Sequence, residues 1–81
     1  MSPSIYFGHI VKSLREERGL SQEVLAYQAD LNRSYVGEVE RGTVMPSLGT
    51  VLKISKALNL SASSLLARYE VYAQSQLELT E

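Results

Sequence analysis

The sequence predicts an all-α protein with one hydrophobic core. Every long segment carries apolar residues at the three- and four-residue spacing of a helix, and no stretch alternates cleanly enough for a strand. Serine or asparagine precedes each predicted helix, where its side chain can cap the free backbone N–H groups. A chain of 81 residues also leaves little room for a deep substrate pocket. We therefore expect a compact bundle of five short helices.

The first two helices follow from these signals. The first is expected to start after Ser2, with Pro3 in its first turn, and to stop at Gly19. The second starts after Ser21, although Val24 at the third position leaves the capping box incomplete. The inward stripe of the first helix is Phe7, Ile10, Val11 and Leu14, and that of the second is Leu25, Ala26 and Ala29.

Three more helices are expected after Asn32, Ser47 and Ser61, and the third ends at Gly42 while the fourth closes at Asn59. The inward residues of the third helix are Tyr35, Val36, Val39 and Glu40, and those of the fourth are Leu48, Val51, Leu52, Ile54 and Leu58. Helices two and three are short, about eight or nine residues each, and are joined by a tight turn, which is typical of a helix-turn-helix. This motif is expected from Ser21 to about Arg41.

Composition excludes several kinds of site. The chain has no cysteine, and its only histidine, His9, has no second ligand at a suitable spacing, so we expect neither a metal nor another cofactor. No catalytic serine, histidine and carboxylate set and no phosphate-cradling glycine loop is present, so the sequence predicts no enzyme and no small-molecule ligand. The chain also lacks a membrane-spanning apolar run and a signal peptide, which favours a cytoplasmic location without membrane association.

A family resemblance rests on several spaced strings of residues. They are GLSQE at 19–23, LA at 25–26, LNRSYV at 31–36 and VERG at 39–42. Together with the loop, proline and helix that follow, they resemble the Cro/C1-type (lambda-repressor-like, XRE) helix-turn-helix family of transcriptional regulators, over roughly residues 5–67. The resemblance implies a DNA-binding domain over 1–67, followed by a C-terminal extension over 68–81. The short chain and the opening Arg33-Ser34-Tyr35 are also similar to controller proteins of restriction-modification systems.

The third helix, over 33–41, is the expected recognition helix. The major groove of B-form DNA admits one helix, and its base edges differ among all four base pairs. Arg33 can donate two hydrogen bonds to guanine O6 and N7, and the alternatives are a phosphate partner or an arginine that is only solvated. Ser34 can contact a base or a phosphate, or can be an ordinary first-turn serine. The net charge of −1 argues against a nucleic-acid partner, but phosphate is bound by a local patch of basic residues.

Other candidate contacts surround Arg33, each with an alternative interpretation. Tyr35 either bonds a phosphate or covers the edge of the core, and Gly37 allows either close approach to DNA or tight helix packing. Glu38 either accepts from a cytosine amino group or repels a phosphate and so disfavours wrong sequences. Gln22, at the positive end of the second helix, is expected to bind a phosphate, the alternative being an ordinary surface glutamine. The remaining candidate DNA contacts are Asn32, Arg41 and Thr43, the last in a loop that otherwise only connects two helices.

The family resemblance further implies a partly buried ion pair between Arg15 and Glu40 that ties helix one to helix three. A separate apolar stripe at helical spacing predicts a dimer through Leu65, Leu66, Tyr69 and Tyr72. Such a homodimer would place its recognition helices about 34 Å apart on a near-palindromic operator of double-stranded DNA. The alternative is that Leu65 and Leu66 complete the monomer core and 74–81 form a polar tail.

Two other functions are compatible with the same fold. An antitoxin would bind DNA and also silence a toxin, but no surface in the sequence marks such a partner. A protein-interaction module would use the five helices without DNA, which the net charge of −1 favours. The arginine at the start of helix three, Arg33, argues against the second possibility.

Overall fold

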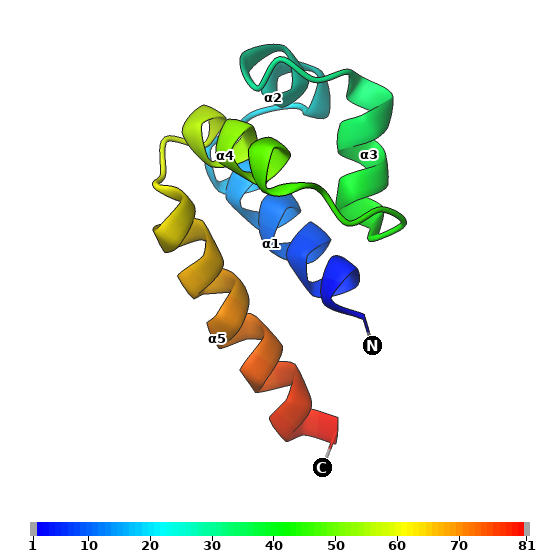
Figure 1. Ribbon diagram of the computed structural model, residues 1–81, viewed down its shortest axis with the longest axis vertical. Helices are drawn as coiled ribbons and strands as arrows, with labels where there is room; N and C mark the ends of the chain where they lie inside the picture. Colours follow the sequence, from blue (N-terminus) through cyan, green and yellow to red (C-terminus); the bar gives the residue numbers. More distant parts are fainter. Residues whose placement is uncertain (1, 81) are drawn as a thin grey trace.

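The computed structural model describes residues 2–80, and these form five helices and no strand, as predicted (Figure 1). The helices are α1 (Pro3–Glu17), α2 (Gln22–Gln28), α3 (Arg33–Arg41), α4 (Leu48–Ala57) and α5 (Ala62–Thr80). α1 packs against both α3 and α5, while α4 packs against α5 and α2. None of the described helices is both long and apolar enough to cross a membrane.

All five helices contribute to one core. Its largest fully buried side chains are Val11, Leu14, Leu25, Val36, Val39, Ile54, Leu58 and Leu65. Because Leu65 on α5 belongs to this core and α5 continues unbroken to Thr80, the expected division between 67 and 68 falls inside a helix. A polar tail beginning at position 74 is likewise replaced by helix, and Glu81 lies outside the described residues.

Helix α4 differs from its predicted orientation. Leu48 and Leu52 were expected to point inward, but they are 69% and 51% exposed. The buried residues of α4 include Val51, Ile54 and Ser55. When the face that carries these three residues packs inward, Leu48 and Leu52 lie outside it and are exposed. A small polar side chain, that of Ser55, therefore takes a place in the interior, where its hydroxyl donates to the Leu52 carbonyl at 3.0 Å.

Four of the five predicted capping residues use their side chains. Ser21, Asn32, Ser47 and Ser61 each accept a hydrogen bond from the backbone N–H three residues later, at 2.8–3.2 Å. Ser2 occupies the N-cap position of α1 but makes no such bond, because its hydroxyl lies 2.9 Å from the Ser4 hydroxyl instead. α1 itself ends at Glu17, and the left-handed Gly19 follows two residues later with φ +67°.

The crossing of α1 and α3 depends on a glycine that the sequence analysis did not single out. A Cβ atom on Gly8 would lie 2.2 Å from the Val39 carbonyl oxygen and 2.7 Å from that of Glu40. Backbone atoms of α3 cannot yield as a flexible side chain can. Gly8 therefore allows the two helix backbones to approach closely enough to fix the position of α3.

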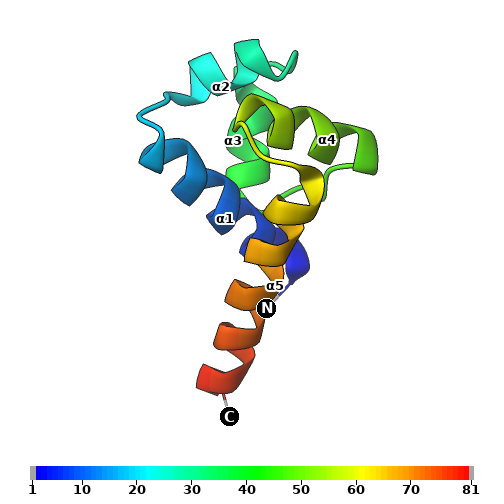
Figure 2. The ribbon, with the colours of Figure 1, turned by 90° about the vertical axis from the view of Figure 1, so that its left-hand side faces the viewer.

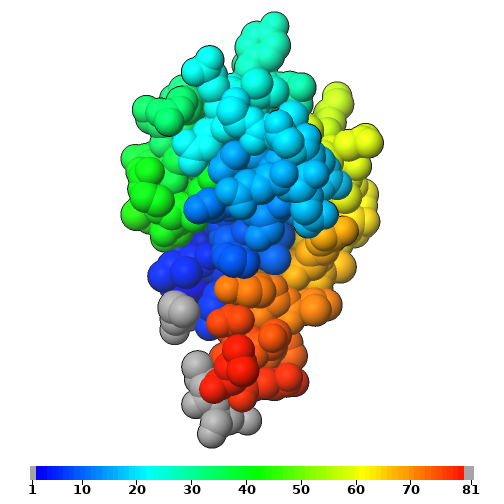
Figure 3. Space-filling model, turned by 180° about the vertical axis from the view of Figure 1, so that it is seen from behind, coloured from blue at the N-terminus to red at the C-terminus, as the bar shows by residue number. Residues whose placement is uncertain are grey.

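Aromatic contacts hold the long helix α5 against α1. Tyr72 contacts Tyr6 edge to face, with ring centroids 5.8 Å apart, and stacks on His9 at 4.4 Å. Tyr69 lies against Phe7 at 6.4 Å. The two helices lie side by side on one face of the molecule (Figure 3), and the end of α5 projects beyond the other helices (Figure 2).

Candidate nucleic-acid interface

The helix-turn-helix forms where it was predicted. α2 and α3 lie together at one end of the molecule (Figure 1), joined by a turn in which the Leu31 N–H donates to the Ala26 carbonyl at 2.8 Å. Asp30 adopts the left-handed conformation in this turn, with φ +56°. The turn ends at Asn32, whose side-chain oxygen caps α3. The start of α3 is therefore fixed by a local hydrogen bond.

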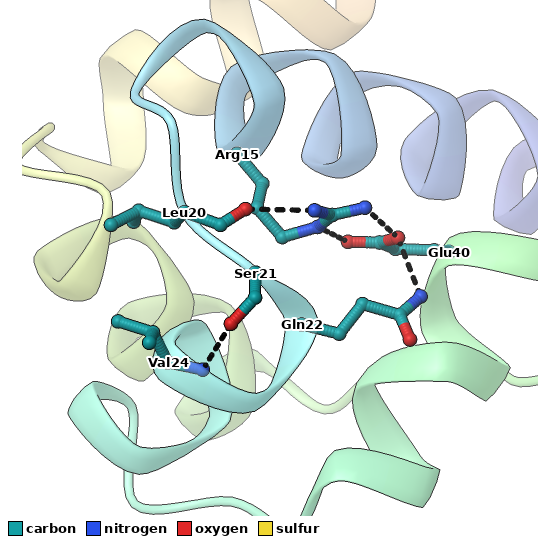
Figure 4. A network of polar contacts seen from close by, with 6 residues as sticks. All are labelled: Arg15, Leu20, Ser21, Gln22, Val24 and Glu40. Carbon is teal, nitrogen blue, oxygen red and sulfur yellow. Dashed lines mark hydrogen bonds and ion pairs between the residues drawn. The ribbon is translucent and has the colours of Figure 1, made fainter.

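A buried ion pair joins α1 to the inner side of α3 (Figure 4). Arg15 Nε donates to Glu40 Oε2 at 2.6 Å, and Arg15 Nη2 donates to Oε1 at 3.0 Å. The third nitrogen, Nη1, donates to the Leu20 carbonyl at 2.8 Å. The Glu40 side chain is only 3% exposed, and its hydrogen bonds raise the pKa of Arg15 although burial opposes this. This is the contact that the family resemblance implies.

Gln22 has a partner that the sequence analysis did not foresee. Its amide Nε2 donates to Glu40 Oε1 at 2.9 Å, so the side chain is tied to the buried ion pair. The carbonyl oxygen of the same amide points away from Glu40 (Figure 4). An amide nitrogen carries two hydrogens, so one N–H is left for an outside acceptor. The expected phosphate contact of Gln22 remains a prediction that is compatible with this orientation.

The outer side of α3 carries free cationic groups. Arg33 and Arg41 are exposed, and neither guanidinium forms a hydrogen bond or an ion pair with another group among residues 2–80. Ser34 is exposed beside Arg33. A guanidinium presents up to five N–H donors and no acceptor, so this surface suits a partner rich in oxygen or nitrogen acceptors.

The other predicted contact residues are placed less openly. Tyr35 is half-buried and packs against the core, and Glu38 is half-buried while its backbone carbonyl accepts from both the N–H and the hydroxyl of Thr43 at 3.1 Å. Asn32 uses its side-chain oxygen for the cap, which leaves its NH₂ group exposed. Thr43 is exposed in the loop after α3. Asn32 and Thr43 are therefore exposed polar residues beyond the two ends of α3.

The two interpretations of Gly37 can be compared directly. The atoms nearest to a Cβ on Gly37 would be Arg41 Nη1 at 3.1 Å, then Arg41 Cζ and Gln22 Oε1, both at 3.9 Å. These atoms belong to the ends of side chains and not to a packed backbone as at Gly8. Tight packing between helices therefore does not explain the glycine at position 37.

The stripe expected to form a dimer is largely used within the monomer. Leu65 is fully buried in the core, and Tyr69 and Tyr72 are half-buried against α1. Only Leu66, 38% exposed, remains partly open. The expectation that this stripe lacks a partner inside the chain is wrong, because α5 lies across α1 and α4. Other apolar side chains are exposed instead: Leu48 and Leu52 on α4, and Val71, Leu77 and Leu79 on α5.

Comparisons with known proteins agree with this geometry. Residues 11–65 match the helix-turn-helix protein family. Control protein C.BamHI of Bacillus amyloliquefaciens is 43% identical over 63 residues, which cover 76% of this chain and 78% of that protein. The restriction-modification controller protein C.AhdI from Aeromonas hydrophila is 45% identical over 76% of this chain and 94% of its own, with a TM-score of 0.74.

A third similar protein has been crystallised with DNA. The restriction-modification controller protein C.Esp1396I, as a tetramer in complex with its natural 35 base-pair operator, superposes with a TM-score of 0.83. Its sequence is 25% identical, and the match covers 89% of this chain and 95% of that one.

Proposed function

This chain belongs to the helix-turn-helix family of transcriptional regulators, and we propose that it binds a specific double-stranded DNA operator with α3 in the major groove. The observation that carries the proposal is the difference between the two sides of α3. Its inner side is fixed to α1 through Glu40, while Arg33 and Arg41 on the outer side have no partner among residues 2–80. A rigid helix with unpaired guanidinium groups is suited to recognising base edges and phosphates.

We assign the candidate contact residues to two groups, those that reach the bases and those that contact the DNA backbone. Arg33, in the first turn, donates two hydrogen bonds to guanine, and Ser34 beside it allows close approach. Residues at the edge of the surface contact the DNA backbone and fix the register of the helix. We assign Gln22, Asn32, Tyr35, Arg41 and Thr43 to this second group. Glu38 disfavours sequences that bring a phosphate near it.

Selection from random duplex DNA tests this proposal. The protein is mixed with a random library, retained duplexes are sequenced, and affinity for the enriched site is measured at several salt concentrations. One enriched sequence with two symmetric halves is the expected result. Retention of all duplexes equally would contradict sequence-specific binding. Arg33→Ala should weaken binding to the enriched site. Arg68→Ala is its matched control, because it also removes one arginine but from α5, where Arg68 pairs with Glu17 and not with DNA.

We further propose that the protein acts as a homodimer and that its α4 side forms the contact. Leu48 and Leu52 lie one turn apart on α4 and are more than half exposed, and Leu66 on the adjoining α5 is partly exposed. Exposed apolar side chains of this size on a small domain favour burial against a second copy. This assignment replaces the stripe that includes Leu65, Tyr69 and Tyr72.

Sedimentation of the protein at tens of micromolar tests whether the exposed leucines of α4 form the dimer contact. Leu52→Lys should give a monomer, whereas Leu79→Lys, which adds the same charge at an exposed site near the end of α5, should leave the dimer intact. A monomeric parent would contradict the dimer. A dimeric Leu52→Lys variant would contradict the assignment to α4.

The genomic role is proposed from the named relatives. C.BamHI and C.AhdI are control proteins, so we propose that this chain regulates restriction-modification genes in the cytoplasm and has no catalytic activity of its own. The operator found by selection should then occur upstream of a restriction or methyltransferase gene in the source genome. Its absence from every such position would contradict this role.

A further inference from the structure

The side chain of Arg41 lies back along α3 over Gly37. Residues four apart share one face of a helix, and their side chains lean toward its N-terminus. Since Gly37 has no side chain, Arg41 Nη1 comes within 3.1 Å of the point where a Cβ would stand. Gly37 is buried, and the atoms nearest to its Cβ point belong to Arg41 and Gln22. The guanidinium therefore lies along the middle of the helix and not at its end.

Gln22 borders the same place from α2. Its carbonyl oxygen lies 3.9 Å from the Cβ point of Gly37, on the side next to α2. The amide cannot turn freely, because Nε2 donates to the buried carboxylate of Glu40 at 2.9 Å. The Gln22 oxygen and the Arg41 guanidinium therefore both border the Cβ point of Gly37. We call the space bounded by Gly37 and Gln22 the Arg41 seat.

We propose that the Arg41 seat holds this guanidinium in place for one DNA phosphate, so that Gly37 determines affinity without bonding to DNA. The inference rests on the proposed DNA-binding function. Arg41 has no hydrogen-bond or ion-pair partner among residues 2–80, so its donors are available to two phosphate oxygens. It belongs to the last turn of α3, away from the N-terminal residues that reach the bases. Holding a long side chain in its bound position lowers the entropy lost on binding.

Gly37→Ala is the decisive variant because stability and binding should change in opposite directions. Alanine favours the helix over glycine, and the added methyl group displaces only the end of the Arg41 side chain and no backbone atom, so the melting temperature should rise. Affinity for the selected operator should fall about three- to tenfold, because Arg41 is displaced from its seat. Unchanged or tighter binding by Gly37→Ala would overturn the proposal.

A double-mutant cycle separates the seat from a simple obstruction. Arg41→Ala should weaken binding by about tenfold, and Gly37→Ala should cause no further loss in that background. A loss that persists without Arg41 would mean that the methyl group itself obstructs DNA, which would overturn the seat. Arg41→Ala should also weaken all operator variants equally and lower the salt slope by about one. A loss confined to one base pair would overturn the phosphate assignment.

Two controls complete the experiment. Gly49→Ala makes the same change in α4, where the nearest atom to the new Cβ is Ser47 Oγ at 3.9 Å, and it should leave operator affinity unchanged. Arg68→Ala removes one positive charge from α5 and should also bind as the parent does. If the parent binds no DNA, the proposed function fails; if the parent binds and Gly37→Ala is indistinguishable from Gly49→Ala, the seat alone fails.

Discussion

The inner and outer sides of α3 obey different constraints although they belong to the same nine-residue helix. On the inner side, the Glu40 carboxylate accepts from Arg15 and from Gln22, and little of it is exposed. On the outer side, the guanidinium groups of Arg33 and Arg41 have no such partners among residues 2–80. The inner side of α3 therefore serves the stability of the fold, and the outer side is available for binding. A substitution should cost stability on one side and binding on the other.

Two glycines illustrate the same difference. At Gly8 a Cβ would strike backbone oxygens of α3, whereas at Gly37 it would meet the end of the Arg41 side chain. The same residue type is therefore required by packing in one helix and left free by packing in another. What distinguishes them is the nature of the neighbouring atoms and not the local sequence.

The largest effect is expected on the inner side, from breaking the ion pair. Either Glu40→Leu or Arg15→Met should lower the free energy of unfolding by about 3–5 kcal/mol, because one buried charge is left without its partner. The double variant should recover much of this loss. Urea denaturation of the three variants measures it. Single variants as stable as the parent would show that this side of α3 is not constrained by charge.

The second-largest effect is expected from Gly8→Ala. The free energy of unfolding should fall by about 3 kcal/mol, because the new Cβ overlaps the Val39 carbonyl oxygen. The α1 and α3 backbones would have to separate. Thermal melting beside Gly49→Ala, where the atom nearest to the new Cβ is Ser47 Oγ at 3.9 Å, provides the comparison. If both variants melted above the parent temperature, the close approach of α1 and α3 would be disproved.

The smallest effect in free energy should come from the outer side and appear only in binding. Arg33→Ala is expected to cost about 1–3 kcal/mol of specific binding and to relax base preference at one position in each half-site. Its free energy of unfolding should stay within about 0.5 kcal/mol of the parent value. Titration against the operator and its single-base variants tests this. A uniform loss across all of them would assign Arg33 to phosphate.

Local features of the sequence were sufficient for the helices and for the position of the recognition surface. The caps at Ser21, Asn32 and Ser47 involve residues only three positions apart, so they can be inferred from adjacent residue types. The same holds for Arg33, whose place in the first turn of α3 follows from the cap before it. Its exposure could be predicted because it does not depend on packing against a distant segment of the chain.

The tertiary structure decided what depends on two segments meeting. Gly8 is needed because α3 crosses it, Gln22 is oriented because Glu40 lies opposite, and Leu65 is buried because α5 returns across the core. Likewise, periodicity gave α4 an apolar stripe, but only packing against α2 and α5 chose which leucines face inward. The physical reason is that spacing along a helix defines a face, while the neighbour that covers this face is set by distant parts of the chain.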